Sequence, residues 1–134
     1  MSGTAAALDR VASVLVLDDD PDLLDLVAMV LEMEHFEVRC AKNGTEGLAS
    51  VAAAGPPDLV LLDLKMPVMD GWEFARRFRA RYGEAAPIVV LTAADDARKR
   101  AAEVRPAAWL SKPFDIDVLI NTVQRQLRMR SEAG

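Results

Sequence analysis

Five polar side chains stand within two positions of the end of a short apolar run of the sequence, where a buried strand would end. Two of them are adjacent aspartates, and the others are an aspartate, a threonine and a lysine: Asp18, Asp19, Asp63, Thr92 and Lys112. Clustered carboxylates repel one another, and a hard divalent cation would relieve that repulsion. Mg²⁺ is the natural candidate because it takes oxygen ligands from one or two carboxylates and keeps waters for a phosphoryl partner. The set predicts a phosphoryl-transfer site, where catalysis is mostly positioning and charge neutralisation.

The lysine and the threonine fit the same chemistry. Lys112 supplies a fixed positive charge for a phosphoryl oxygen, and Thr92 supplies a short hydrogen-bond donor. An aspartate after a strand is commonly a helix N-cap or a turn residue, and Asp20 and Asp70 are interpreted as caps. Caps alone do not explain five polar residues at the ends of four separate runs, so the other aspartates are interpreted as functional.

The elements that must position these residues alternate between short apolar runs and helical patterns. Continuous apolar runs predict strands buried on both faces. The predicted strands cover residues 14–17, 36–41, 59–62, 88–91 and 107–110. Strands that alternate with helices predict an α/β fold with a parallel sheet covered on both faces. In such sheets the ligand binds beyond the carboxyl ends of the strands.

Helical spacing predicts which side chains pack on this sheet. The stripe predicted for the first helix consists of Leu23, Leu26, Val27, Val30 and Leu31. A weak, Ala-rich helix is predicted over about 95–104, and the last helix is amphipathic over 116–127. The arginines of a middle helix are interpreted as a solvated face: Arg76, Arg77, Arg79 and Arg81.

Length and composition restrict the class of protein. The chain has 134 residues, 51% hydrophobic and 28% charged, which fits one globular domain and excludes a disordered chain. We expect a flexible lead-in over 1–12, the domain over 13–130 and a C-terminal tail over 131–134, with a polar end from Arg128 to Gly134 that frays. The apolar runs are too short to span a bilayer, and the lead-in lacks the features of a signal peptide.

Cysteine content and net charge indicate the expected cellular compartment and restrict the classes of binding partner. A single Cys40 cannot form an internal disulfide, which fits a reducing, cytoplasmic compartment. The net charge of −5 leaves no basic footprint for direct nucleic-acid binding. The lone His35 argues against a zinc site.

Four segments together resemble the receiver domain of two-component response regulators, over about residues 12–130. The segments are Val14-Leu15-Val16-Leu17-Asp18-Asp19-Asp20-Pro21, residues 58–71 from Asp58-Leu59 to Asp70-Gly71, Pro87-Ile88-Val89-Val90-Leu91-Thr92-Ala93, and Leu110-Ser111-Lys112-Pro113-Phe114. The resemblance implies a flavodoxin-like (βα)5 fold with strand order 2-1-3-4-5. It also implies a single-domain regulator of the chemotaxis type.

The resemblance implies a role for each residue of the set. Asp63 is the expected phosphoacceptor. Asp19 and Asp63 are expected to ligate Mg²⁺ directly, Asp18 through water, and Lys65 through its backbone carbonyl. Thr92 and Lys112 are expected to contact the phosphoryl group, and the Lys112-Pro113 bond is expected to be cis. Trp109 occupies the place of a switch aromatic that moves with Thr92.

The resemblance also implies the partners. A sensor histidine kinase or a phosphotransfer protein is expected to donate the phosphoryl group, and a downstream protein is expected to bind the face built by the 95–104 helix, the 107–110 strand and the last helix. No membrane is expected to be a partner. The family often has Gly-Ala before the last strand, where this chain has Arg105-Pro106, so the end of the preceding helix should be altered.

Two other functions are weighed against a non-enzymatic phosphoacceptor. A phosphatase of the haloacid-dehalogenase type also uses a strand-end aspartate and Mg²⁺, but it needs an acidic residue where this chain has Lys65. A binding module with a receiver fold that works without phosphorylation is favoured only by the altered 103–108 segment.

Overall fold

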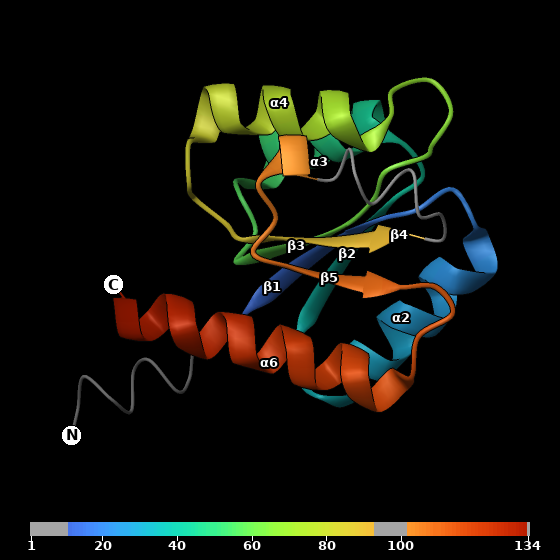
Figure 1. Ribbon diagram of the computed structural model, residues 1–134, viewed down its shortest axis with the longest axis vertical. Helices are drawn as coiled ribbons and strands as arrows, with labels where there is room; N and C mark the ends of the chain where they lie inside the picture. Colours follow the sequence, from blue (N-terminus) through green and yellow to red (C-terminus); the bar gives the residue numbers. More distant parts are fainter. Residues whose placement is uncertain (1–10, 93–101, 134) are drawn as a thin grey trace.

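The sheet is parallel and has the strand order β2-β1-β3-β4-β5 (Figure 1). This computed structural model describes residues 11–92 and 102–133. Its strands are β1 (Ser13–Leu17), β2 (Glu37–Ala41), β3 (Leu59–Asp63), β4 (Ile88–Thr92) and β5 (Ala108–Ser111). The order is the one that the sequence predicts, and the fold is flavodoxin-like.

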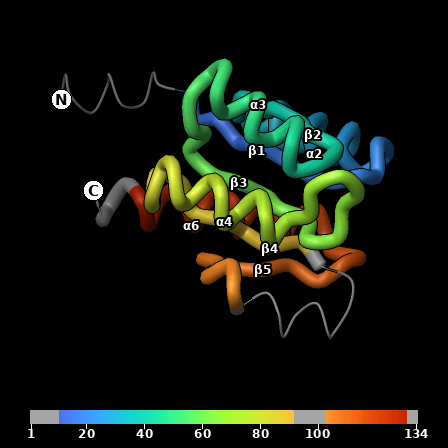
Figure 2. Tube along the Cα trace, turned by 90° about the horizontal axis from the view of Figure 1, so that it is seen from above, coloured from blue at the N-terminus to red at the C-terminus, as the bar shows by residue number. Residues whose placement is uncertain are grey.

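Helices cover both faces of the sheet, α3 and α4 on one and α2 and α6 on the other (Figures 1 and 2). Their bounds are α2 (Pro21–Met33), α3 (Gly44–Ala54), α4 (Gly71–Tyr82) and α6 (Ile116–Ala133), with a short 3₁₀ helix η1 (Ala102–Val104). Within the described ranges, no helix is long and apolar enough to cross a membrane.

The strand runs fill two separate core layers because successive side chains point to opposite faces. On β3, Val60 and Leu62 face α3 and α4, whereas Leu59 and Leu61 face α2 and α6. All four are fully buried. This double burial explains the continuous apolar run of β3, in which the first polar residue, Asp63, comes where the strand ends.

Aspartate and asparagine side chains begin the first three of these helices. Asp20 Oδ1 accepts from the backbone N–H of Asp22 at 3.0 Å, and Asp70 Oδ1 accepts from Glu73 N–H at 2.9 Å. Asn43 caps α3 in the same way through Glu46 N–H at 2.9 Å. The interpretation of Asp20 and Asp70 as caps is confirmed.

Several expectations for the helices need correction. Leu26 does not belong to the core stripe of α2, since it is 40% exposed and Leu24 is buried in its place. The helix predicted over 95–104 lies mostly outside the described residues, and its described end forms η1. At the C-terminus α6 continues to Ala133, beyond the point where the sequence predicts a frayed tail.

The loop after β3 carries a strained residue that predicts a stabilising substitution. Val68 has φ of 69° and is 84% exposed, so it has a left-handed backbone without compensating burial. A β-branched residue is a genuine outlier in that region. We expect Val68→Gly to raise the free energy of unfolding by about 1 kcal/mol, because glycine removes the Cβ penalty and little packing is lost. Urea denaturation measures the change.

A matched control places the same substitution in ordinary backbone. Val118 is 46% exposed and lies in α6. Val118→Gly should lower the free energy of unfolding by roughly 0.5 kcal/mol, since Val118 has ordinary helical backbone in the first turn of α6 and glycine is the poorer helix former. Equal destabilisation by both substitutions would show that the backbone at Val68 carries no strain.

Candidate functional site

Three carboxylates converge at the carboxyl edge of the sheet. Oxygens of Asp18, Asp19 and Asp63 lie within 4.8 Å of one another. Asp18 and Asp19 follow β1, and Asp63 is the last residue of the adjacent β3. Asp18 and Asp63 are buried and Asp19 is exposed, so the cluster opens to solvent on one side. The structure thus brings together the three aspartates that the sequence singles out.

Lys112 projects from the end of β5 into this cluster. Its Nζ lies 2.5 Å from Asp18 Oδ2 and 3.7 Å from Asp63 Oδ2. The second oxygen of Asp18 accepts from the backbone N–H of Asp20 at 2.9 Å. Asp18 therefore holds the ammonium beside Asp63, a direct role in placing Lys112 that the sequence does not predict. The Lys112-Pro113 bond is cis, as the resemblance implies.

Electrostatic effects of opposite sign act on Asp63. The pKa of its carboxyl is raised to about 6, mainly by burial and further by the neighbouring Asp18 and Asp19 carboxylates. The Lys112 ammonium and a hydrogen bond from the backbone N–H of Lys65 lower it. Because the effects that raise the pKa are larger than those that lower it, the site disfavours the ionised form of Asp63. An added positive charge would stabilise that ionised form.

The ligand set suits a hard divalent cation. Three carboxylates within one small cluster offer only oxygen atoms, which Mg²⁺ prefers over nitrogen or sulfur. The only thioethers close in sequence, Met66 and Met69, pack against the core cluster of α3 and α4. The residues present therefore fit Mg²⁺, and neither methionine is needed as a ligand.

Tight backbone packing fixes the position of Asp63 relative to α4. The N–H of Gly71, the first residue of α4, donates to the carbonyl oxygen of Leu64 at 2.8 Å. A Cβ at Gly71 would lie 2.5 Å from the Asp63 carbonyl oxygen and 2.7 Å from Leu64 Cα. Only glycine allows this approach, so α4 begins in direct contact with the backbone of the site.

The two residues expected to switch lie on adjacent strands. Thr92 ends β4, and its backbone is in register with Ser111, the neighbour of Lys112. The position of the Thr92 hydroxyl lies outside the described part of the structure. Trp109 is in register with Val90 and packs, partly buried, against the core cluster of α3 and α4.

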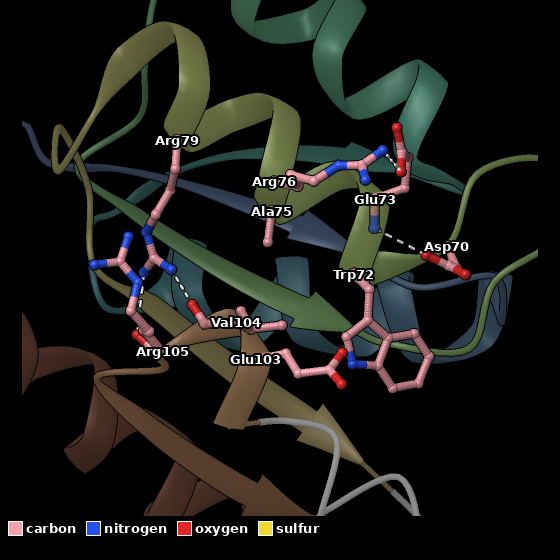
Figure 3. Close-up of a pocket in the computed structure, with 9 residues that line it drawn as sticks. All are labelled: Asp70, Trp72, Glu73, Ala75, Arg76, Arg79, Glu103, Val104 and Arg105. Atoms are coloured by element: carbon pink, nitrogen blue, oxygen red, sulfur yellow. Dashed lines mark hydrogen bonds and ion pairs between the residues drawn. The ribbon is translucent and has the colours of Figure 1, made fainter.

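Arg79 is the main residue that sequence reasoning misplaced. Its side chain is only 11% exposed, and its guanidinium donates to the backbone carbonyls of Val104 and Arg105 (Figure 3). The prediction of a solvated face is wrong for this arginine. Helical spacing contained the signal, because Arg79 is four residues after the buried Ala75 and one after the buried Phe78.

Comparison with known proteins identifies the family of this chain and finds relatives about twice its length. The model of the response regulator receiver domain matches residues 14–124. The chain is 36% identical over 118 residues to the DNA-binding dual master transcriptional regulator RpaA of Synechocystis, with 86% of this chain and 48% of that protein covered. It is 38% identical over 123 residues to the transcriptional regulatory protein PrrA of Mycobacterium bovis, with 90% and 52% covered. The chain spans about half the length of these curated relatives.

Solved structures agree with this assignment. The chemotaxis protein CheY4 of Vibrio cholerae superposes with a TM-score of 0.79 and 32% identity, covering 87% of this chain and 99% of that chain. A CheY-like receiver domain protein of Methanospirillum hungatei superposes with a TM-score of 0.85 and 25% identity, covering 93% and 100%. Because the family match includes the ends of all the strands that build the aspartate cluster, the chain belongs to the response regulator receiver domains of two-component systems.

Proposed function

We propose that this chain is a phosphoacceptor switch in which Asp63 receives a phosphoryl group from a histidine kinase or a phosphotransfer protein. One observation carries the proposal: Asp63 lies in a cluster of three carboxylates, with the Lys112 ammonium 3.7 Å away. This arrangement offers a nucleophilic oxygen, a cation site and a positive charge for the transferred group. It serves signalling rather than turnover of a substrate.

The proposed step forms one bond and breaks one. A carboxylate oxygen of Asp63 attacks the phosphorus of the donor's phosphohistidine, the P–O bond forms and the P–N bond breaks. The imidazole nitrogen leaves with the electron pair and takes up a proton. Mg²⁺ held by Asp19, Asp63, the Lys65 carbonyl and, through water, Asp18 would neutralise charge on the phosphoryl oxygens. Lys112 turns from Asp18 toward those oxygens.

The proposed output passes through β5 and α6. A phosphoryl group brings up to about two negative charges and three acceptor oxygens to Asp63. Thr92 and Lys112 bind these oxygens from β4 and β5, and Trp109 on β5 responds to the change. A downstream protein would then bind the face that includes β5 and α6. RpaA is named a DNA-binding regulator, whereas here we propose a protein as the direct partner.

Intact mass measurement tests the phosphoacceptor. Incubation with acetyl phosphate or phosphoramidate and Mg²⁺ should add one phosphoryl group, and omission of Mg²⁺ or the substitution Asp63→Asn should abolish the addition. Asp117→Asn, which removes an exposed carboxylate of α6, is the matched control and should be labelled like the wild type. Equal labelling of the Asp63→Asn variant would refute the assignment.

A further inference from the structure

Arg79 joins two parts of the molecule that are distant in sequence. From α4 its guanidinium reaches across a groove to the end of η1, where it donates to the Val104 carbonyl and, at 3.1 Å, to the Arg105 carbonyl (Figure 3). Its Nε lies 3.8 Å from Glu84 Oε2. A guanidinium presents several donors in a fixed geometry, so two carbonyl bonds determine where this backbone lies relative to α4.

The backbone that Arg79 holds leads directly into β5. Val104 is buried in the core cluster of α3 and α4, and Ala107 N–H donates to the Ile88 carbonyl at 2.9 Å as the strand begins. β5 is an edge strand, in register with β4 on one side. An edge strand has one neighbouring ladder instead of two, so contacts at its start have a large influence on its position.

These contacts connect α4 and β5 to Asp63 from two sides. The first residue of α4, Gly71, is bonded to Leu64 and packs on the Asp63 backbone. Arg79, two turns further along the same helix, holds the segment before β5. β5 then carries Trp109 and ends before Lys112, whose ammonium is 3.7 Å from Asp63. The helix is thus a rigid connection between the Asp63 loop and the strand that carries Lys112.

We propose that Arg79 is a positioning residue that fixes the start of β5, and with it Trp109 and Lys112, relative to the Asp63 loop. The consequence for signalling rests on the proposed phosphoacceptor function, whereas the placement of β5 does not. The buried position of the guanidinium supports the proposal, since desolvation lowers the pKa of Arg79. A side chain buried in this way contributes its two backbone bonds and adds little to the exposed charge of the surface.

The first experiment uses the unmodified protein. Arg79→Met keeps much of the aliphatic volume and removes both donors. We expect hydrogen exchange of the Ala107 amide to accelerate by roughly tenfold or more, with a smaller change for β1 amides. Arg79→Lys keeps one cationic donor and should show an intermediate rate. Arg76→Met is the matched control, because Arg76 is exposed and bonds to Glu73 within the same helix.

The second experiment follows the response to phosphorylation in a Trp72→Phe background, so that Trp109 alone emits. Beryllofluoride, which mimics the phosphoryl group, should change the Trp109 emission. In the Arg79→Met variant we expect the beryllofluoride concentration for half of this change to rise by roughly three- to thirtyfold. Arg79→Lys should recover part of the loss, and Arg76→Met should respond like the parent.

Each outcome decides a different question. Exchange in β5 that changes no more than in β1 would overturn the positioning role. If the parent responds to beryllofluoride, an unaltered Trp109 response in Arg79→Met would overturn the role of Arg79 in signalling. If Arg79→Met loses only global stability, all core amides accelerate together and the beryllofluoride midpoint stays the same, which also contradicts the proposal. If β5 exchange changes as expected while wild-type Asp63 takes no phosphoryl group, the proposed function fails and the positioning role stands.

Discussion

Asp58→Ala is expected to lower the free energy of unfolding by about 2–4 kcal/mol. The carboxylate is buried at the amino edge of the sheet, opposite the edge that carries Asp63, and only 4% of the residue is exposed. It accepts from Ser13 N–H at 2.7 Å and from the Arg130 guanidinium at 2.9 Å. One side chain therefore joins the starts of β1 and β3 to the last turns of α6. Alanine would leave the Ser13 amide without its carboxylate acceptor and Arg130 without its counter-ion.

Urea denaturation followed by circular dichroism measures this loss. Arg130→Met is the companion variant and should cost less, because Arg130 is 40% exposed and the Ser13 bond to the carboxylate remains. Glu84→Ala is the control, since Glu84 is 72% exposed in both of its ion pairs. Exposed pairs contribute little, so its change should stay within about 0.5 kcal/mol. If Asp58→Ala lowers the free energy of unfolding no more than Glu84→Ala does, the bonds of the Asp58 carboxylate do not stabilise the fold.

The contacts of Asp58 also anchor the end of α6, which lies in the polar stretch that the sequence predicts to fray. The sequence after Leu127 is polar, and a polar helix end commonly frays. Arg130 bonds to both the carboxylate and the carbonyl oxygen of Asp58, which anchors this part of α6 on the sheet. The partner is 72 positions away, so no local pattern could indicate the contact.

The fold was predictable because burial on both faces leaves a distinct pattern. Continuous apolar runs such as Leu59–Leu62 predict central strands, and polar residues after them predict the functional edge. Strand order came from the family resemblance, since alternation alone does not determine which strands are neighbours. Helix faces were predicted less well where a helix has more apolar residues than its buried face can hold. In α2, Leu26 fits the helical spacing, but Leu24 is the residue that is buried in the core.

The site was predictable as a set of residues and less so as a set of contacts. The three aspartates were identified correctly as a cluster because each follows or ends a strand of the same parallel sheet. The bond from Lys112 to Asp18 depends on how the turn after β5 directs a long, flexible side chain, which spacing does not encode. Arg79 was missed because an arginine at the border of a helix face can lie in solvent or reach inward.

Millimolar Mg²⁺ is expected to raise the melting temperature of the unmodified chain. A cation that binds only the folded state stabilises it by mass action, by about 2.7 kcal/mol at one hundred times its dissociation constant. For a chain of this size that corresponds to roughly 8 °C. The physical reason is the local excess of negative charge, because three carboxylates of the described residues share one cluster with the Lys112 ammonium. Thermal melts in matched ionic strength with NaCl, with and without MgCl₂, measure the shift.

Two variants separate the site from general effects of charge. Asp19→Asn removes the exposed carboxylate of the cluster and should reduce the shift, whereas Asp117→Asn removes an exposed carboxylate on α6 and should leave it unchanged. Asp19→Asn should also raise the melting temperature without Mg²⁺, because the like-charge repulsion on Asp18 and Asp63 falls. A shift of equal size in both variants would mean that Mg²⁺ acts on the acidic surface as a whole. No shift in the wild type up to tens of millimolar would remove the cation from the proposed mechanism and leave Lys112 as the main positive charge beside Asp63.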